Sequence, residues 1–472
     1  MRHVRVTPAE WTFRGETGVH TRHGPLVIWG GIPGEASDVK ILHEGQNRAY
    51  GSWQHAETPH PHRVEPKCGR YHLCGGCPLM HLTPEGQRDA RRTLVRQALE
   101  AEELGQVPVS EVKPCPDGEE DFRWVIKLGV GYSDHGRLRV GAWGRRTRNI
   151  IPIPQCHVAA PVLRRVMGQV AHHVIEAELE PYNPETDDGV IRAIVLRGSR
   201  ARNEVLVTFV VGRRVKRLHD VAEAVAAAGE VVGVVVHVNY EEGNAIYTRD
   251  EEGAVRTRTM GGRPYLEEVL GDVTYRIGPG DFFQTNPAMA EVLYADVLKE
   301  LALEEGTPFV DLYCGVGGLA LQAARTTGWA LGVEGLEGAV SSAREAAARQ
   351  KIPAEFHVGD VGEVATELAP RLAPTRPVVS VNPSRRGLEE GVVDAVLALK
   401  PRRLAYISCN PRALARDLVA FQKGGMRVER VDLFDMFPQT AHVEAVAYLV
   451  PEQPDDGVSR RAPKRKVLPR KG

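Results

Sequence analysis

Two features that would narrow the function at once are missing from this 472-residue sequence: a net charge of one sign and a long apolar run. Sixty Lys and Arg residues stand against 61 Asp and Glu residues, so the formal charge is −1. Global charge therefore gives no indication of a nucleic-acid partner, and any such surface must be local. No apolar run reaches the roughly 18 residues that a membrane helix needs, and no signal peptide is found. We expect a cytoplasmic protein without membrane contact.

Cysteine is also scarce, with seven residues in the chain, and three of them fall between Cys68 and Cys77. Thiols stay reduced in the cytoplasm, so disulfides are not expected. The clustered cysteines are predicted to be metal ligands, and an isolated one is a candidate catalyst.

The length and the 42% hydrophobic content predict two or three packed domains, because single cores rarely grow past roughly 250 to 300 residues. Short alternating stretches broken by glycines in the first sixty residues predict a small β-barrel. From about 120 to 275 the pattern is mostly of strands, which predicts a central α+β domain. After 288 helices alternate with apolar strands, the pattern of a doubly wound α/β domain.

Two segments stand out between and after these regions. Residues 84–100 show helical periodicity, with Thr83 as the cap and Pro84 in the first turn, and predict a surface helix with a basic face. The last twenty residues begin acidic and end strongly basic, so we expect a disordered tail. Solvation alone, or contact with RNA, explains its charge.

Cys409 stands where an apolar strand over 404–408 runs into a sharp turn, a position that points into a cleft. A glycine-rich turn at Asp311–Gly318 precedes it, and an isolated acid, Glu444, follows in an apolar strand. A carboxylate in such a strand is costly unless it is used. The combination predicts a covalent group-transfer enzyme, although a buried inert thiol and a hydrogen-bonded structural acid are the plain alternatives.

The ends of successive predicted strands carry a candidate cofactor site. Glycines at 315, 317 and 318 let the backbone approach a ligand, and Glu334 ends the next strand, where it can accept hydrogen bonds from ribose hydroxyls. Asp360 ends the third strand and could bind an adenine amino group, and Asn382 closes the same rim. The pattern favours S-adenosylmethionine over NAD, with ordinary turn glycines as the alternative. Arg385 stands where amino-directed methyltransferases usually have an aromatic residue, which argues against that class.

A second candidate site is the cysteine set Cys68, Cys74, Cys77 and Cys156. Four soft sulfur ligands suit either tetrahedral zinc or an iron–sulfur cluster, and the residues alone leave both open.

Several motifs occur in an order that is typical of one family. They are Cys68, Cys74–Cys77, Asp281–Pro287, Asp311–Gly317, Ser408–Pro411 and Asp435–Glu444. From residue 10 to 450 the chain resembles the bacterial RNA uracil-5 methyltransferases. The resemblance implies a [4Fe-4S] cluster in the cysteine set. It also implies that the N-terminal barrel is a TRAM module, an OB-like RNA-binding unit found in the ribosomal RNA branch and missing from typical transfer-RNA enzymes.

The resemblance further implies roles for single residues. Cys409 would add to C6 of uracil, and Glu444 would remove the proton from C5 after methyl transfer. Gln284 and Tyr313 would contact the cofactor together with Glu334, Asp360 and Asn382. The target uridine would lie in a loop and be flipped out of the RNA.

The resemblance also divides the chain. We expect a TRAM barrel over 1–60, a central iron–sulfur and RNA-binding domain over 61–83 and 113–274, a class I, Rossmann-like methyltransferase domain over 84–112 and 275–450, and a basic tail over 451–472.

The predicted activity is 5-methyluridine formation in 23S rRNA by a monomeric enzyme. The motifs at 283–287 and 382–387 most resemble the enzyme for the domain II hairpin loop, yet the shorter form of that enzyme lacks the barrel. Gly318, and Trp124 after Arg123, depart from the residues common in the family. A transfer-RNA T-loop methyltransferase and a non-catalytic iron–sulfur protein that binds RNA or serves in assembly remain as alternatives.

Overall fold

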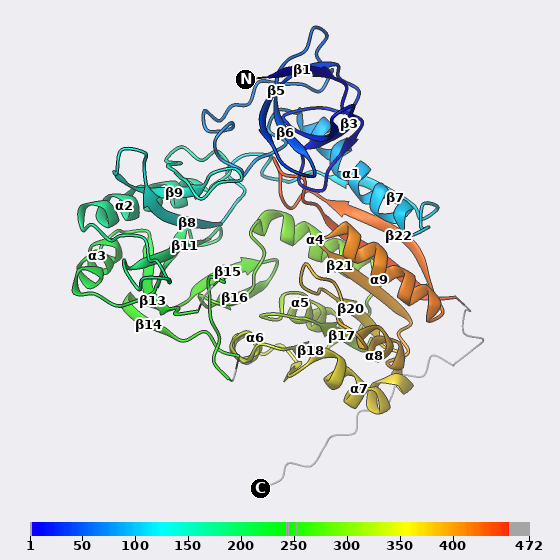
Figure 1. Cartoon of the computed structure of the whole chain (residues 1–472). Helices are drawn as coiled ribbons and strands as arrows, with labels where there is room; N and C mark the ends of the chain where they lie inside the picture. The colour runs from blue at the N-terminus through cyan, green and yellow to red at the C-terminus, as the bar shows by residue number, and fades with distance from the viewer. Residues whose placement is uncertain (1, 242, 244, 252, 453–472) are drawn as a thin grey trace.

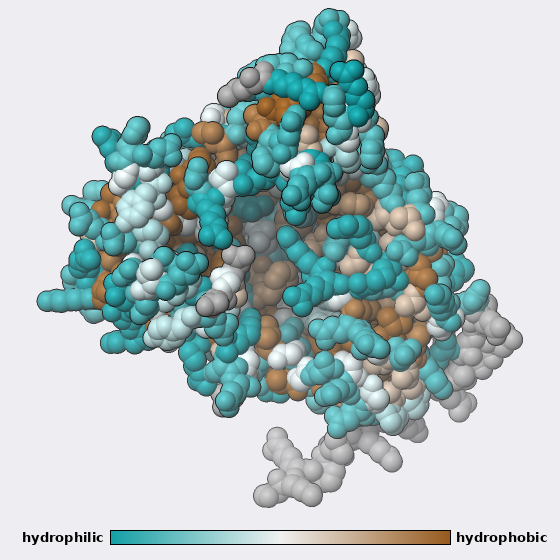
Figure 2. All heavy atoms as spheres, viewed as in Figure 1, coloured by the Kyte–Doolittle hydropathy of each residue, from teal (hydrophilic) through white to brown (hydrophobic). Residues whose placement is uncertain are grey.

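The computed structural model describes residues 2–241, 243, 245–251 and 253–452. Three sheet-based bodies meet around a central recess, which is visible in the space-filling view (Figures 1 and 2). Among the described residues, no helix combines the length and the apolar character that crossing a membrane requires. The predicted tail falls almost wholly on 453–472, outside the described residues.

The N-terminal body is a curled sheet of six short strands, as the glycine-broken alternation predicts. Leu26, Ile28 and Val39 form its buried core. The sheet order is β1-β5-β6-β4-β3-β2. The strands are β1 (His3–Val6), β2 (Glu10–Trp11), β3 (Thr17–Thr21), β4 (Gly24–Trp29), β5 (Ser37–Glu44) and β6 (Ala49–His55).

The central body is a seven-stranded sheet with two helices packed against one face. All pairings are antiparallel except that of β12 with β13, in the order β10-β9-β8-β11-β12-β13-β14. Its elements are β8 (Val125–Tyr132), β9 (Leu138–Trp143), β10 (Ile150–Ile151), α2 (Pro161–Glu176), β11 (Ile191–Ser199), β12 (Glu204–Val211), α3 (Lys216–Ala226), β13 (Val231–Val238) and β14 (Thr257–Gly262). A hairpin of β15 (Leu266–Leu270) and β16 (Val273–Ile277) leads out of it.

The C-terminal body is an eight-stranded mixed sheet in the order β19-β18-β17-β20-β21-β23-β22-β7. Its strands are β7 (Val109–Lys113), β17 (Phe309–Leu312), β18 (Ala330–Glu334), β19 (Ala354–Val358), β20 (Val378–Val381), β21 (Arg403–Ser408), β22 (Met426–Phe434) and β23 (Glu444–Pro451). Its helices are α4 (Pro287–Glu300), α5 (Gly318–Thr327), α6 (Glu337–Gln350), α7 (Val361–Leu372), α8 (Val392–Ala398) and α9 (Pro411–Lys423), with a 3₁₀ turn over Ala373–Thr375. Helices cover both faces, so the predicted doubly wound domain is confirmed.

The strand order reverses at β17, which lies between β18 and β20. In open α/β sheets, ligands bind beyond the carboxyl ends of the strands at such a switch point. The turn that begins at Tyr313 and the residue Asn382 follow these two strands, so the topology brings them to one crevice.

Helix α1 (Pro84–Ala101) begins as predicted, with Thr83 accepting a hydrogen bond from the Gly86 amide. The prediction of a basic surface face is wrong for Arg91, which is fully buried and pairs with Asp435 at 2.6 Å. Helix α1 packs against α9, and the following strand β7 pairs with β22. This segment therefore completes the C-terminal sheet although it precedes the central body in sequence.

Candidate active site

Cys409 lies in the turn between β21 and α9, half-buried. The turn is fixed on both sides of the thiol. Asn410 caps α9 by accepting from the Arg412 amide, and its own amide donates to the Arg385 carbonyl at 2.8 Å. A rigid strand-to-helix turn of this kind presents a side chain at the edge of the sheet.

Glu444 is brought to Cys409 by strand register. Strands β21 and β23 are antiparallel with Ser408 opposite Ala445, so the next pair in the same register is Cys409 and Glu444. Opposed residues in an antiparallel pair project to the same side. Glu444 is only 3% exposed, and its burial raises the pKa of the carboxyl to about 8. The thiol, predicted at a strand end, and the acid, predicted within an apolar strand, therefore form one site.

The electrostatics of the thiol depend on both charged neighbours. Burial first, and then the Glu444 carboxylate, raise the pKa of Cys409 to about 11. Arg385 opposes this shift through its charge and a hydrogen bond to the thiol. From the sequence, Arg385 indicated only that the enzyme is not an amino-directed methyltransferase, and no contact with Cys409 was predicted. Its place as the fourth residue of the motif that begins at Asn382 was the available signal.

A narrow pocket lies beside this pair at the switch point of the sheet. It is lined by Phe282, Phe283, Tyr294, Asp311, Tyr313, Cys314, Gly315, Val316, Gly318, Leu319, Asn382 and Ile407. Gly317 caps α5 with φ = 80°, a left-handed conformation that favours glycine. At Gly318 a Cβ atom would lie 2.7 Å from the Tyr294 hydroxyl, so the loop passes too close to α4 for any side chain. The predicted glycine-rich turn thus lies at the pocket, with a backbone that leaves no room for side chains.

The five predicted cofactor residues do not all reach this pocket. Tyr313 and Asn382 line it. Glu334 is tied to the loop because its carboxylate accepts from the Gly315 amide at 3.0 Å. Gln284 is 5% exposed and hydrogen-bonds to Tyr294. Asp360 is exposed, and its carboxylate caps α7 by accepting from the Glu363 amide at 2.9 Å, so its described contact is local.

Asp311 is an important residue of this pocket that sequence reasoning did not single out. Its carboxylate accepts from the Ser380 hydroxyl at 2.6 Å and from the Ala320 amide at 3.1 Å. Burial raises its pKa to about 7. It joins β17, β20 and α5 at the point where the strand order reverses. An acid at the end of an otherwise apolar strand was the signal.

The segment from 281 to 286 is held between the central and C-terminal bodies. The Trp124 amide donates to the Thr285 carbonyl at 2.8 Å, and Arg197 donates to the Asp281 carbonyl at 2.8 Å. Asn286 caps α4. Phe282 remains 60% exposed at the mouth of the pocket. The central sheet thereby fixes the position of Gln284 and the exposed aromatic ring.

The four predicted metal ligands converge. The free thiols Cys68, Cys74, Cys77 and Cys156 line one pocket of about 360 Å³, which also includes Tyr71. Among the described residues, no three of these sulfurs lie within 4.8 Å of one another. Sulfurs bound about 2.3 Å from one zinc ion would be only about 3.8 Å apart in a tetrahedron.

His81 is packed beside the cysteine loop and does not line that pocket. Its ring is buried between the Tyr71 hydroxyl at 2.8 Å and the Gly31 carbonyl at 3.1 Å, and burial lowers its pKa to about 3. It joins the N-terminal body to the cysteine segment.

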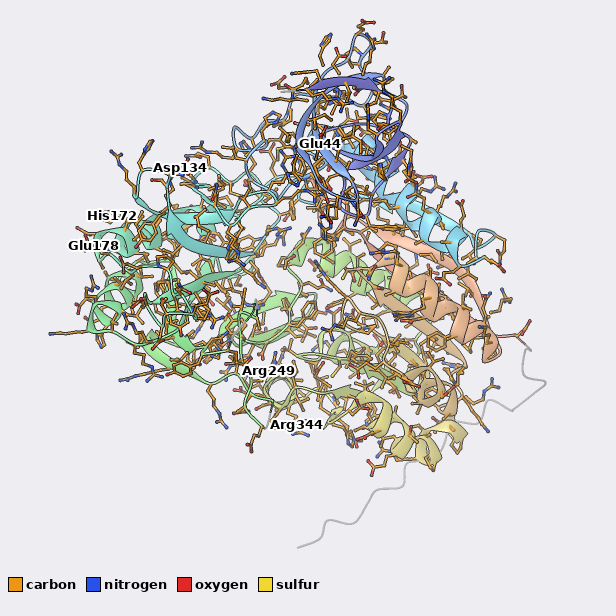
Figure 3. All side chains as sticks on the ribbon, in the orientation of Figure 1. Glu44, Asp134, His172, Glu178, Arg249 and Arg344 are labelled. Carbon is orange, nitrogen blue, oxygen red and sulfur yellow. The ribbon has the colours of Figure 1, made fainter. Side chains whose placement is uncertain are left out.

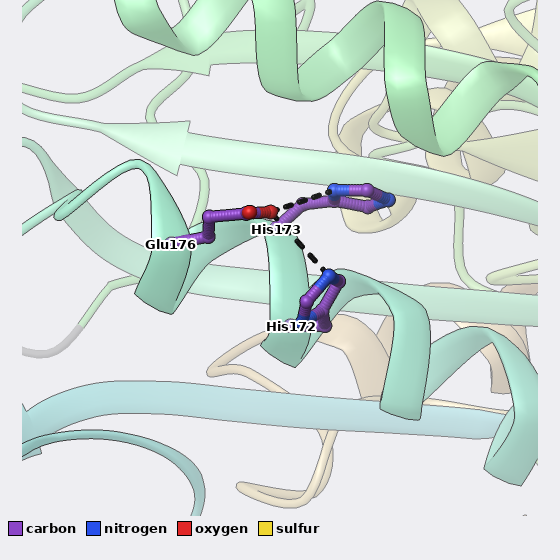
Figure 4. Close-up of side chains that lie close together, drawn as sticks. All are labelled: His172, His173 and Glu176. Carbon is purple, nitrogen blue, oxygen red and sulfur yellow. Dashed lines mark ion pairs between the residues drawn. The ribbon is translucent and has the colours of Figure 1, made fainter.

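A separate group of potential cation ligands, His172, His173 and Glu176, lies at the end of α2 (Figure 4). Figure 3 shows His172 at the outer side of the central body, away from the recess. Glu176 pairs with His172 at 3.4 Å across one helical turn. Such pairs are ordinary on exposed helices.

Taken together, the doubly wound sheet and the pocket at its switch point are those of a class I methyltransferase fold, and the thiol and carboxylate beside the pocket are a candidate catalytic pair. Comparisons with known proteins agree. Residues 375–451 match the family model described as tRNA (Uracil-5-)-methyltransferase. An RNA methyltransferase of Bacillus cereus is 31% identical over 90% of this chain and 92% of its own length. One of Geobacter sulfurreducens is 32% identical over 96% and 91%, respectively.

Among solved structures, the chain is similar to the tRNA (uracil-54, C5)-methyltransferase of Pyrococcus abyssi in complex with S-adenosyl-L-homocysteine. The TM-score is 0.73 and the identity 26%, covering 95% of this chain and 100% of that one. The chain belongs to the RNA uracil-5 methyltransferase family, and it is an RNA methyltransferase.

Proposed function

We propose that this protein transfers a methyl group from S-adenosylmethionine to C5 of a uridine in RNA, with Cys409 as the nucleophile and Glu444 as the base. The observation that carries the proposal is the register of β21 and β23, which sets these two side chains against each other beside the pocket at the switch point.

The first step requires a thiolate, because C5 of uracil is a poor nucleophile until a group adds at C6. Arg385 stabilises the thiolate of Cys409 through its charge and hydrogen bond. Addition of the sulfur to C6 gives an enolate, and its C5 atom attacks the sulfonium methyl group and releases S-adenosylhomocysteine.

The second step is removal of the proton from C5. Glu444 suits it, because a pKa of about 8 makes the carboxylate a stronger base than an ordinary glutamate and leaves a useful fraction ionised near neutral pH. As the proton leaves, the bond between C6 and sulfur breaks, the C5–C6 double bond re-forms, and the thiol is free again.

We propose that Tyr313, Glu334, Asn382 and Gln284 hold S-adenosylmethionine. The first three surround the glycine-rich turn, and Gln284 is fixed next to Tyr294 in the pocket wall. Asp360 stays a proposed adenine ligand only if the α7 cap opens or if its second oxygen is used, because one oxygen accepts from the Glu363 amide.

We propose that Cys68, Cys74, Cys77 and Cys156 hold a [4Fe-4S] cluster. The sulfur separations and the pocket of about 360 Å³ fit a multi-atom cluster better than one tetrahedral ion. The cluster would cross-link the cysteine segment to the central body, and the proposed methyl transfer needs no electrons from it.

The proposed substrate is 23S rRNA, on the motifs at 283–287 and 382–387, and the N-terminal sheet is proposed to be a TRAM module. A transfer RNA is the second candidate. The Pyrococcus enzyme covers 95% of this chain, so its coverage extends over most of the N-terminal body, and that enzyme acts on tRNA. The N-terminal body therefore does not decide between the two substrates.

The test is to incubate the holoenzyme with labelled S-adenosylmethionine and, separately, undermodified ribosomal RNA and transfer RNA. We expect label in 5-methyluridine from one RNA, and its loss in Cys409→Ala. Cys115→Ala, which removes a thiol outside the pocket, is the matched control. Transfer that survives Cys409→Ala would exclude the mechanism, and mapping 5-methyluridine in cells without the protein would identify the nucleotide.

A further inference from the structure

The central sheet has one covered and one partly open face. Side chains alternate along a strand, and Ile126 and Leu128 of β8 pack in the core formed with α2 and α3. Lys127 and Gly129 therefore point to the opposite face. Register places Arg197 of β11 on this face too, because Arg197 is opposite Val125. The β15–β16 hairpin packs on the part of this face near β11 and β12, and at the β8–β9 end, open beyond the hairpin, the Ile150 side chain lies over Gly129 and Gly131.

An exposed tryptophan lies on this open end. The ring of Trp143, the last residue of β9, covers Gly129, where a Cβ atom would lie 2.9 Å from the ring. Glycine at 129 thus makes room for the indole and for the Ile150 side chain, whose Cδ1 atom would lie 2.6 Å from the same Cβ. Trp143 is nevertheless 43% exposed, which is high for so large an apolar side chain with a packed neighbour.

Trp143 forms one wall of a groove of about 820 Å³. The other walls include Tyr182, Arg148 and Arg192, with a single acid, Glu185. The Arg192 guanidinium faces the Tyr182 ring at 5.5 Å and is anchored on the carbonyls of Asn239 at 3.0 Å and Glu241 at 2.5 Å. These neutral partners fix the arginine without cancelling its charge.

Cations continue from this groove toward the catalytic pair. Lys127 precedes Gly129 by two residues on the same strand face, and the charges of Arg197 and Arg385 both act on it. Burial and these two like charges lower the pKa of Lys127. Arg385 also contacts Cys409, so the positive strip connects the groove to the active site.

We propose that this groove binds an unpaired base of the RNA substrate, stacked on Trp143, while Lys127 and Arg197 contact the phosphates that lead from it to the uridine at Cys409. The inference rests on the proposed function only in taking RNA as the substrate. Aromatic side chains stack on any splayed base, and fixed arginines and lysines track the backbone. The groove therefore contributes affinity for the RNA and fixes the position of its loop, at a site separate from the methyl-transfer pocket.

The binding test uses a fluorescein-labelled, single-stranded, uridine-containing 12-mer RNA and the full-length holoenzyme. Trp143→Ala removes the stacking of one base, so its Kd for this RNA should be roughly tenfold or more above that of the unmodified protein. Trp143→Phe keeps an aromatic ring and should recover most of the affinity. The matched control is Tyr132→Ala. Tyr132 ends β8 and is an aromatic residue as exposed as Trp143, but its position lies on the other face of the central sheet, away from the groove. Equal affinity of Trp143→Ala and Tyr132→Ala would overturn the proposal, as would failure of Trp143→Phe to recover binding.

A second measurement needs no variant and so does not depend on how Trp143→Ala folds. The same RNA with 5-iodouridine is photo-cross-linked to the unmodified protein, and the linked peptides are identified by mass spectrometry. Cross-links at Trp143 or Tyr182 support the groove. Cross-links confined to Phe282 or to the N-terminal body overturn it.

The two proposals fail in different ways. If the RNA cross-links at Trp143 but no RNA accepts a methyl group, the proposed function fails and the groove stands. If methyl transfer occurs and Trp143→Ala keeps the same Kd and KM, the groove fails and the function stands. Where both hold, Trp143→Ala raises KM about tenfold and leaves the single-turnover rate at saturating RNA unchanged.

Discussion

Two buried carboxylates at the two ends of one segment differ in how they are used. Asp435 follows β22 and forms a 2.6 Å ion pair with the fully buried Arg91. Glu444 begins β23, and its carboxylate receives no hydrogen bond from the residues that the structure describes. Burial raises the pKa of both groups, but only Asp435 has a cation in contact. The paired acid Asp435 holds two parts of the fold together, whereas the unpaired Glu444 is the acid that we propose takes a proton.

The segment between the two acids is fixed by contacts with helix α1. Gln439 exchanges hydrogen bonds with Gln87 of α1 at 2.8 and 3.0 Å, and Arg91 donates to the Thr440 carbonyl at 3.1 Å. Helix α1 therefore holds the whole connection in place. The segment that leads to Glu444 is thereby anchored at Asp435 and along its length.

Replacing Glu444 should have the largest effect on activity. Glu444→Gln removes the base but keeps the shape, so we expect turnover to fall by roughly 10³-fold or more. Methylated RNA should remain bonded to Cys409, because elimination requires loss of the C5 proton. The measurement is a denaturing gel with labelled RNA, on which a covalent complex accumulates.

Glu268→Gln is the control for that variant. Glu268 is also a buried acid, but it is satisfied by the Arg200 and Ala201 amides at 2.6 and 2.9 Å, away from the cleft. It should turn over normally and form no lasting adduct. Normal turnover by Glu444→Gln would remove the distinction between the two acids of the 435–444 segment.

Replacing Arg91 should have the largest effect on stability. Arg91→Met leaves the Asp435 carboxylate buried without its partner, which typically costs about 3–5 kcal/mol. We expect a clearly lower urea midpoint for unfolding of the C-terminal body, followed by its near-ultraviolet circular dichroism. The double variant Arg91→Met/Asp435→Leu should recover much of the loss. If the single variant is as stable as the unmodified protein, the ion pair does not anchor the segment.

The sequence predicted strands and motifs well, but it did not predict pairings. The strand-rich pattern from about 120 to 275 located β11, β12 and β13, and the motif order located Cys409 and Glu444. The antiparallel register that opposes these two residues depends on how distant strands pair, which no local pattern contains. Asp360 illustrates another limit, because an acid between a strand and a helix suits a helix cap and a ligand contact equally well. Arg91 looked like a surface residue because its partner lies in a distant part of the chain.

The pH dependence of proton removal should distinguish Glu444 from an ordinary acid. Only the carboxylate takes the proton, and its pKa is about 8, so the rate of adduct breakdown should fall as pH drops below that value. Between pH 8 and pH 6 we expect a decrease of roughly 50-fold, since the ionised fraction falls from about one half to about one hundredth. Rapid-quench measurement of adduct decay checks it. A rate that is flat down to pH 5 would mean that Glu444 titrates normally or is not the base.

The smallest effect should be a gain in stability from the same change that destroys activity. The pKa of Glu444 rises from 4.5 to about 8 on folding, so between these values the folded protein binds more protons than the unfolded chain. Stability then falls as pH rises through this window, and the penalty is complete above about pH 8. Glu444→Gln has no such penalty, and we expect it to be about 1–3 kcal/mol more stable than the unmodified protein at pH 9, with no gain near pH 4.5. The free energy equivalent to the full pKa difference would not be recovered, because a buried amide also needs partners.

Thermal unfolding of Glu444→Gln at pH 9 and pH 4.5 tests this expected gain in stability. Asp435→Asn should lower the unfolding temperature at pH 9, since it leaves the Arg91 cation unpaired. Equal changes in unfolding temperature for the two variants would show that ion pairing is not what separates the two acids.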